Sequence, residues 1–255
     1  MLLAVDVGNT NLTIGIFDGE RLAADWRIKT DLEQTADGWG ALFHTLASLA
    51  GLNLRDVDGF VFASVVPQLD ASICGVASRY LKLEPLQVTA NTRTGLKIRV
   101  DTPQEVGADR IVNSAAAAAR YGCPSIAVDF GTAITFDAIS KHREYLGGII
   151  CPGIQVSAQA LVRRTARLPQ IELRQPAKVI GSSTVGSLQS GFYYGMLGMV
   201  DGILETMLPV LGTDATVIAT GGQSESLAKD SRFIQVLHPN LTLEGLRMLW
   251  HLNRA

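Results

Sequence analysis

The sequence predicts an α/β protein built from two similar halves, in which mixed sheets are flanked by helices. Two observations lead to this prediction. The segment Ala4–Gly8 recurs almost unchanged as Ala127–Gly131, 123 residues further along a chain of 255 residues. Apolar strand-like runs also alternate with helix-like runs, and no Pro/Ser-rich linker interrupts them. We therefore expect residues 1–115 and 116–255 to form the two halves.

In the first half, we assign strands to apolar runs bounded by turn residues, and helices to apolar residues repeating every three to four positions. Pro67 is expected to end one apolar strand, and the alanine-rich run before Gly122 favours a helix. The expected strands are 2–6, 12–17, 21–30, 59–66 and 86–89, and the expected helices are 36–50, 69–81 and 111–121.

The second half is expected to open with the same kind of β-hairpin. The uncharged segment Gly147–Gly153 is interpreted as a glycine-rich loop, and Thr242 as the N-cap of a last helix. Glycines recur every three to four residues in a long predicted helix, which favours close packing against another helix, in the same subunit or across a dimer. The expected strands are 125–129, 134–136 and 217–219, the expected helices are 154–164, 187–210 and 242–252, and 165–186 is expected to be loop-rich.

Composition and charge exclude several classes of protein. A net charge of -2 and a pI near 6.1 argue against a general nucleic-acid surface, and no dense basic run predicts a membrane patch. The cysteines Cys74, Cys123 and Cys151 are too widely spaced to indicate a zinc site or a disulfide framework. No signal peptide and no stretch of about 18 uncharged apolar residues is recognised. We expect a soluble cytoplasmic protein with no nucleic-acid or membrane partner.

Each repeated segment is an apolar strand that ends in an aspartate and continues into a glycine turn. In the first copy, Gly8 permits a tight turn, the amides of Asn9–Asn11 suit phosphate oxygens, and Asp6 can hold Mg²⁺. Taken alone, this copy is more often an ordinary β-turn. The second copy, Asp129–Ala133, favours a phosphate clamp, since a carboxylate ending a buried strand is costly unless it is paired or binds a cation.

Three further segments carry open alternatives. In Gly107–Arg110, Asp109 is either a general base beside an anion-binding arginine or a carboxylate favoured by a helix N-terminus. Thr220–Gly222 is either an adenosine site or a simple turn, and Gly181–Ser187 is either a binding loop or a helix cap. P-loop, dinucleotide-binding, protein-kinase and GxSxG motifs are not found, and the four histidines are isolated.

Taken together, these motifs resemble those of the type III pantothenate kinases over the whole length of the chain. The matching segments, in the family's order and spacing, are Asp6–Asn11, Ser64–Pro67, Gly107–Arg110, Asp129–Ala133, Gly147–Gly153 and Thr220–Gly222. The resemblance implies an actin-like ATPase fold with the active site in the cleft between the halves. It also implies a homodimer with the site near the subunit interface, and use of ATP, Mg²⁺ and a monovalent cation, K⁺ or NH₄⁺. The implied reaction transfers the γ-phosphate of ATP to pantothenate, the first step of coenzyme A biosynthesis.

The resemblance also implies roles for individual residues. Asp109 would accept the proton of the pantothenate hydroxyl, Asp129 would bind the monovalent cation, and Thr132 would contact ATP. Thr165–Pro169 resembles a segment that a partner subunit contributes, and it remains open whether Val100 contacts substrate, because some members carry an aromatic residue there. The expected ATP-binding residues are Asp6 (also near Mg²⁺, directly or through water), Val7, Gly8, Asn9, Thr10, Asn11, Leu12 and Thr13, and the expected pantothenate-binding residues are Gly107, Ala108, Asp109, Arg110 and Thr184.

Two alternative functions stay open at this point. An actin-like kinase for another small hydroxylated substrate would share the two hairpins without needing Gly107–Arg110. An ATP-binding accessory factor for transcription, without kinase activity, would keep the two phosphate-binding hairpins and would not need Asp109 as a base. The presence of Asp109 favours a kinase over the accessory factor.

Overall fold

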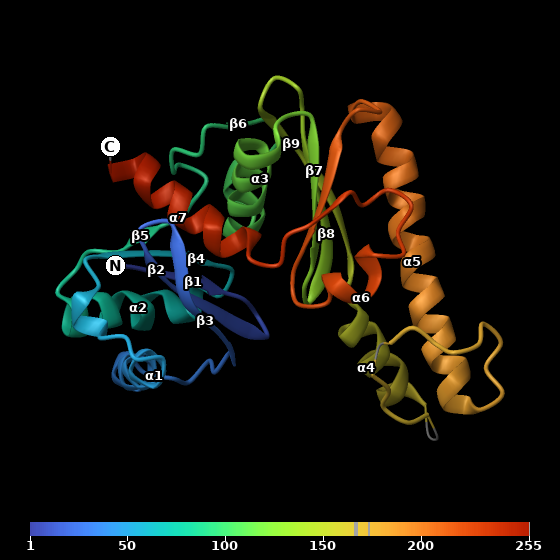
Figure 1. The fold of residues 1–255 in the computed structure, drawn as a ribbon, viewed down its shortest axis with the longest axis horizontal. Coiled ribbons are helices and arrows are strands. Elements are labelled where there is room, and N and C mark those ends of the chain that lie inside the picture. The colour runs from blue at the N-terminus through green and yellow to red at the C-terminus, as the bar shows by residue number, and fades with distance from the viewer. Residues whose placement is uncertain (166–167, 173, 255) are drawn as a thin grey trace. The chain divides into compact units, whose positions relative to one another are not determined.

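The computed structural model describes residues 1–165, 168–172 and 174–254, which form two compact units (Figure 1). Unit 1 comprises Met1–Leu96, Asp101–Ala116 and the chain from Leu241 to the C-terminus, and unit 2 comprises Lys97–Val100 and Ala117–Asn240. The division expected between residues 115 and 116 lies beside one of these boundaries. The C-terminal helix, however, packs with unit 1.

Unit 1 contains a five-stranded sheet in the order β3-β2-β1-β4-β5. The first three strands are antiparallel, whereas β1, β4 and β5 run parallel. Its strands are β1 (Leu2–Val7), β2 (Asn11–Asp18), β3 (Arg21–Lys29), β4 (Gly59–Ser64) and β5 (Leu86–Gln87), its helices are α1 (Ala36–Leu49), α2 (Pro67–Val76), α3 (Ala108–Tyr121, shared with unit 2) and α7 (Leu241–Arg254), and its short turns are η1 (Leu54–Asp56), η2 (Ala77–Leu81) and η3 (Pro103–Glu105).

Helices cover both faces of this sheet because β1 is buried on both sides. Leu3, Val5 and Val7 pack in one core with residues of α1 and α2, whereas Leu2 and Ala4 pack in another with residues of α3 and α7. Successive side chains of a strand point to opposite faces. Asp6 therefore lies on the α3 face, at the end of the strand.

Unit 2 contains a six-stranded sheet in the order β11-β10-β7-β8-β9-β6. The core formed by β7, β8 and β10 includes residues of α4, α5 and α6 on one face. The strands are β6 (Lys97–Ile98), β7 (Ser125–Phe130), β8 (Ala133–Ile139), β9 (Glu144–Pro152), β10 (Thr216–Thr220) and β11 (Val236–Leu237), and the helices are α4 (Ile154–Arg164), α5 (Thr184–Leu211) and α6 (Ser224–Ala228).

The two sheets repeat one topology. The order β3-β2-β1-β4-β5 in unit 1 matches β9-β8-β7-β10-β11 in unit 2, with three antiparallel strands followed by parallel ones in both. The predicted pair of similar α/β halves with mixed sheets is therefore confirmed. The repeated sequence forms the central strands β1 and β7.

Four local expectations were wrong. Gly147–Pro152 belongs to strand β9 and not to a loop. Thr242 lies inside α7, where its hydroxyl donates to Asn113 Oδ1 at 2.8 Å, so it is not the N-cap. Helices α3 and α5 each begin three residues before the expected starts at 111 and 187, because apolar periodicity marks a helix's buried face and not its polar first turn.

Helix α5 is the one described helix that is long and apolar enough to span a membrane by length and composition. This is weak evidence for such a span, since helices of soluble proteins pass the same test. Asp201 of α5 is buried and accepts hydrogen bonds from the Ser231 hydroxyl at 2.6 Å and from Arg232 Nε at 3.1 Å. This side of the helix therefore packs on the protein itself.

Candidate functional site

The first glycine turn is held by backbone hydrogen bonds at the end of β1. The Gly8 N–H donates to Asn11 O at 3.1 Å, and the Val65 N–H donates to Val7 O at 3.0 Å. A Cβ at Gly8 would lie 2.8 Å from Asn11 O, so no other residue fits the turn without a shift. Asn9 and Thr10 are exposed at its tip. The turn thus presents polar groups to solvent from a rigid base.

The segment Gly107–Arg110 lies beside this turn within unit 1. Gly107 O accepts the Ile111 N–H at 3.2 Å, so Asp109 falls in the first turn of α3. A Cβ at Gly107 would lie 3.4 Å from Val65 Cγ1 and 2.5 Å from Asp109 Oδ1. Val65 therefore links the two segments, and Gly107 leaves room for the carboxylate.

The Asp109 carboxyl group has an unusual electrostatic environment. Burial raises its pKa above the usual range. A hydrogen bond from the Arg110 backbone and the positive charge of Arg110 lower the pKa, but by less than burial raises it. The Arg110 N–H donates to Asp109 Oδ1 at 2.8 Å, and its guanidinium carries a positive charge. A half-buried carboxylate with a raised pKa at a helix N-terminus is a candidate proton acceptor.

The second glycine turn is one residue shorter than the first. Gly131 N–H donates to Ala133 O at 3.0 Å, and Phe130 pairs with Ile134 across the hairpin. Asp129 lies directly opposite Thr135 of β8 and Thr220 of β10, and neighbours in register point to the same face of a sheet. Asp129 is therefore flanked by two threonines.

The Asp129 carboxylate and the β10 turn pack closely together. Gly221 has a φ of +91°, and a Cβ there would overlap Asp129 Oδ1. The Thr220 hydroxyl donates to Pro239 O at 3.3 Å. The Thr135 hydroxyl donates to Asp137 Oδ2, also at 3.3 Å. A hydroxyl that donates its proton elsewhere keeps its lone pairs for another partner.

Asp137 is fully buried on the same sheet face as Asp129. Its Oδ1 accepts the hydroxyl of Tyr145, which is also fully buried, at 2.8 Å. This network fixes the rotamer of Thr135. Sequence reasoning missed Thr135, Asp137 and Tyr145, and it did not place Thr220 beside Asp129, because only strand register brings these residues together and threonine is common in strands.

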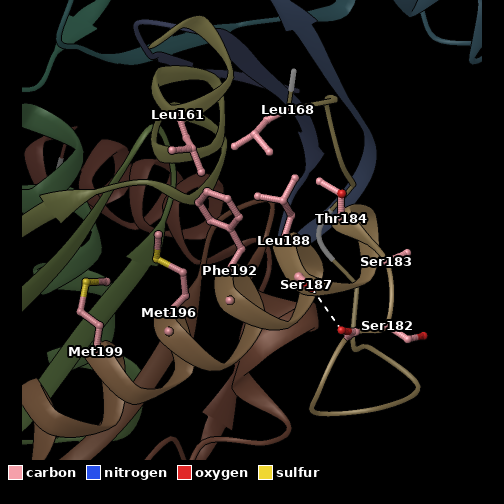
Figure 2. A pocket seen from close by; sticks show the side chains of 13 residues that line it. Leu161, Leu168, Ser182, Ser183, Thr184, Ser187, Leu188, Phe192, Met196 and Met199 are labelled. Atoms are coloured by element: carbon pink, nitrogen blue, oxygen red, sulfur yellow. Dashed lines mark hydrogen bonds between the residues drawn. The ribbon is translucent and has the colours of Figure 1, made fainter. Parts of the chain in front are cut away.

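Thr184 lies at the start of α5, beside a cavity of about 910 Å³. Ser183 is the N-cap of α5 and accepts the Gly186 N–H at 3.1 Å, so the cap interpretation of this loop holds. Figure 2 shows apolar side chains of α5 and Leu161 of α4 pointing into the cavity. Its lining from α5 includes Leu188, Phe192, Met196 and Met199.

A second cavity, of about 320 Å³, lies directly after the Thr220–Gly222 turn. Ile154, Ile171 and Phe192 are among its apolar lining residues, and Gln223 also lines it. Among the described residues, Gln223 Oε1 is buried without a hydrogen-bond partner. A ligand in this cavity that donates a hydrogen bond to Gln223 Oε1 would satisfy this acceptor.

The structure thus brings the predicted residues together in three groups of known geometry. Asp6–Thr13 and Gly107–Arg110 lie together in unit 1, Asp129 and Thr132 lie at the second turn, and Thr184 lines the large cavity in unit 2. Val100 packs against Gly147: a Cβ added at Gly147 would lie 3.4 Å from Val100 Cγ1. Of the predicted partner segment Thr165–Pro169, residues 166 and 167 lie outside the described part of the chain.

Comparisons with known proteins bear on the whole chain. The family model described as type III pantothenate kinase matches residues 2–206. The type III pantothenate kinase of Solibacter usitatus (strain Ellin6076) is 49% identical over 253 residues, which cover 99% of this chain and 97% of that protein.

Solved structures with lower identity share the fold. A Campylobacter jejuni protein described as a Baf family transcriptional activator has a TM-score of 0.59 at 18% identity, covering 99% of this chain and 98% of its own. A Sinorhizobium meliloti protein described as a 2-dehydro-3-deoxygalactonokinase has a TM-score of 0.57 at 14% identity, covering 98% of both chains. The expected actin-like fold of the sugar kinases is confirmed.

Replacing Asp109 with asparagine is expected to raise the melting temperature at pH 7. A raised pKa in the folded state means that the ionised carboxylate opposes folding, and the asparagine amide removes that charge while its oxygen can still accept the Arg110 N–H. The gain should shrink as the pH falls through the raised pKa, because the wild-type carboxyl is then protonated.

Thermal unfolding across the acid pH range checks this expectation. The exposed Asp101→Asn is the control for loss of one negative charge, with an expected change within about 0.5 kcal/mol. A melting temperature of Asp109→Asn below that of the wild type at pH 7 would contradict the electrostatic account.

Proposed function

The chain belongs to the type III pantothenate kinase family, and on that premise we propose that it transfers the γ-phosphate of ATP to the primary hydroxyl of pantothenate. The product is 4'-phosphopantothenate, and the reaction opens coenzyme A biosynthesis. The observation that carries the proposal is 49% identity to a type III pantothenate kinase over 99% of this chain. The enzyme is a phosphotransferase with an alcohol group as acceptor.

Asp109 is the proton acceptor in this proposal. Phosphoryl transfer depends mainly on alignment and charge neutralisation, so the base needs to orient the hydroxyl and take its proton late. Burial raises the pKa of the Asp109 carboxyl, which makes its ionised form a stronger base than an exposed aspartate. Gly107, Ala108 and Arg110 contact pantothenate, and the guanidinium suits its carboxylate.

The first turn, Asp6–Thr13, holds the ATP phosphates. Gly8 lets the backbone approach them, and Asn9–Asn11 supply amide and hydroxyl donors. Asp6 lies near Mg²⁺, directly or through water, and the ion neutralises triphosphate charge when bound. Mg²⁺ prefers oxygen ligands and keeps several waters, so one carboxylate together with the phosphates would suffice to hold it.

Asp129 binds the monovalent cation, K⁺ or NH₄⁺. The donor set around it fits such an ion, because one carboxylate is flanked by the Thr135 and Thr220 hydroxyls, whose protons are donated elsewhere. Asp6 has Ala63 in the place that Thr220 takes beside Asp129. Thr132, at the tip of the same turn, contacts ATP.

The adenosine of ATP lies in the cavity after Thr220–Gly222. The apolar wall formed by Ile154 and Phe192 suits a base, and the adenine amino group can donate to the otherwise unpartnered Gln223 Oε1.

Two copies of the chain form a homodimer through α5, with the site near their interface. A Cβ added at Gly191, Gly195, Gly198 or Gly202 would have nothing within 4 Å, so this side of α5 is open to close approach. The same helix contributes apolar side chains to the large cavity. Thr184 at the rim contacts pantothenate, and Thr165–Pro169 is supplied across the interface.

The enzyme works in the cytoplasm, where its three cysteines remain reduced. Cys74, Cys123 and Cys151 are free in the structure.

The two alternatives, another small-molecule kinase and an ATP-binding accessory factor, are separated from pantothenate kinase by one experiment. Purified protein with ATP, Mg²⁺ and KCl is assayed for ADP release and phosphorylated product with pantothenate and with a panel of small alcohols. Release that depends on pantothenate supports the proposal, and no turnover of pantothenate under these conditions refutes it.

Asp109→Asn is expected to lower kcat by about 10²–10⁴, the usual contribution of a general base, while ATP affinity stays unchanged. In the wild type, kcat/KM for pantothenate should fall on the acid side at a pH above about 3.9, the ordinary aspartate value, since the raised pKa protonates Asp109 earlier. Steady-state kinetics measure kcat of the variant and the pH dependence of kcat/KM in the wild type, with Asp101→Asn as the control variant. Near-wild-type turnover by Asp109→Asn would remove it from the role.

Asp129→Asn is expected to abolish saturable activation by K⁺, and Thr135→Val to raise the K⁺ concentration for half activation about tenfold, as the loss of one oxygen ligand implies. Initial rates are measured against KCl, with choline chloride holding ionic strength constant. An unchanged K⁺ curve for Asp129→Asn would exclude the site.

Gly195→Glu is expected to give a folded monomer with activity reduced at least tenfold, because a charged side chain on the open face of α5 blocks close helix packing. Light scattering with size exclusion, circular dichroism and kinetics measure the effect. Leu49→Glu, at an exposed leucine of α1, is the control and should remain dimeric. A wild-type monomer with full activity contradicts the shared-site proposal.

A further inference from the structure

Thr30 directly follows β3 and lies against the first glycine turn. Its side chain is only 8% exposed. Its hydroxyl donates to Gly8 O at 2.6 Å, and its N–H donates to Thr10 O at 2.9 Å. One residue therefore holds two carbonyl groups of a turn whose tip, Asn9 and Thr10, is exposed.

These two bonds fix the direction of the peptide groups in the turn. A trans peptide is planar, and its C=O and the following N–H point in opposite directions. Because Gly8 O and Thr10 O point to Thr30, the N–H groups of Asn9 and Asn11 point away from it. Backbone N–H groups at a turn bind anions, so these two are candidate donors to a phosphate.

The second half of the chain supplies an internal comparison. Gly153 directly follows β9, as Thr30 follows β3, and its N–H donates to Thr132 O at 3.0 Å. It has no hydroxyl, and a Cβ there would overlap Thr132 O and lie 2.6 Å from Gly131 O. The backbone bond is thus common to both turns, whereas the hydroxyl bond belongs to the first turn alone.

We infer that Thr30 is a positioning residue for the phosphates of ATP. It does not touch the nucleotide; its hydroxyl holds the Gly8 peptide group so that the Asn9 N–H faces the phosphates. The anchor adds to the Gly8 N–H bond to Asn11 O, and it further limits the backbone angles of a residue that has no side chain to restrict them. The inference rests on the proposed role of Asp6–Thr13 in phosphate binding.

Thr30→Val tests the hydroxyl, because valine keeps the shape and the backbone N–H. Loss of one well-formed hydrogen bond should raise KM for ATP about tenfold and leave KM for pantothenate unchanged. Inhibition by adenosine, which has no phosphates, should not change. Thr30→Ser should restore the ATP value. A residue with only a structural role would not separate ATP from adenosine.

Thr94→Val is the matched control. Thr94 is 6% exposed in the same unit, and its hydroxyl oxygen accepts the Leu96 N–H at 3.2 Å. The variant removes a buried hydroxyl of similar exposure away from the turn, so KM for ATP should stay at the wild-type value. Melting temperatures of both variants show how much stability each change removes.

Gly8→Val separates failure of this inference from failure of the proposed function, since its Cβ would lie 2.8 Å from Asn11 O and distort the turn. If KM for ATP is unchanged in Thr30→Val but raised in Gly8→Val, the role of Thr30 is overturned and the phosphate-binding assignment stands. Wild-type ATP kinetics in both overturn the phosphate-binding assignment as well.

Hydrogen exchange on the wild type gives a second measurement that needs no variant to fold. Addition of ATP and Mg²⁺ should slow hydrogen exchange of the backbone N–H groups of Asn9 and Asn11, which face the phosphates in this arrangement. Unchanged exchange of both amides at saturating ATP overturns the inference.

Discussion

A carboxylate at the end of a buried central strand is the constraint on which the rest of the structure depends. β1 and β7 are covered by side chains on both faces, and a charge inside either strand would be costly. Asp6 and Asp129 therefore stand where the strand emerges, and a glycine turn follows at once. In α/β folds this edge of the sheet is where ligands bind. Burial of the two strands thus places both carboxylates at the positions where we propose that cations and phosphates bind.

The two turns share a design and differ in detail. The first has one more residue, places Asp6 beside Ala63, and is anchored by the Thr30 hydroxyl. The second is shorter, flanks Asp129 with two threonines, and has Gly153 where the first has Thr30. The Thr30 bonds direct two N–H groups of the first turn away from Thr30, and the threonines of the second turn place two hydroxyl groups beside a carboxylate. Donors suit phosphate and oxygens suit a cation, so the physical differences match the proposed division of work.

Sequence reasoning could predict the repeated halves, because the repeat marks both central strands and strand patterns depend on local residues. It could not predict Thr30, Thr135 or Asp137, since their contacts come from strand register and from residues distant in the sequence. The glycines of Gly147–Gly153 predict a loop, yet pairing with β8 holds this stretch as strand up to Pro152. Local preference is overridden where tertiary pairing supplies the hydrogen bonds.

A crystal structure with a non-hydrolysable ATP analogue, Mg²⁺ and pantothenate tests the central claim most directly. We expect the phosphates to accept hydrogen bonds from the Asn9 and Asn11 N–H groups, with Thr30 still bonded to Gly8 O. The primary hydroxyl of pantothenate should lie within hydrogen-bond distance of the Asp109 carboxylate. Phosphates bound away from the Gly8–Asn11 turn, or a hydroxyl that faces another base, would contradict the account.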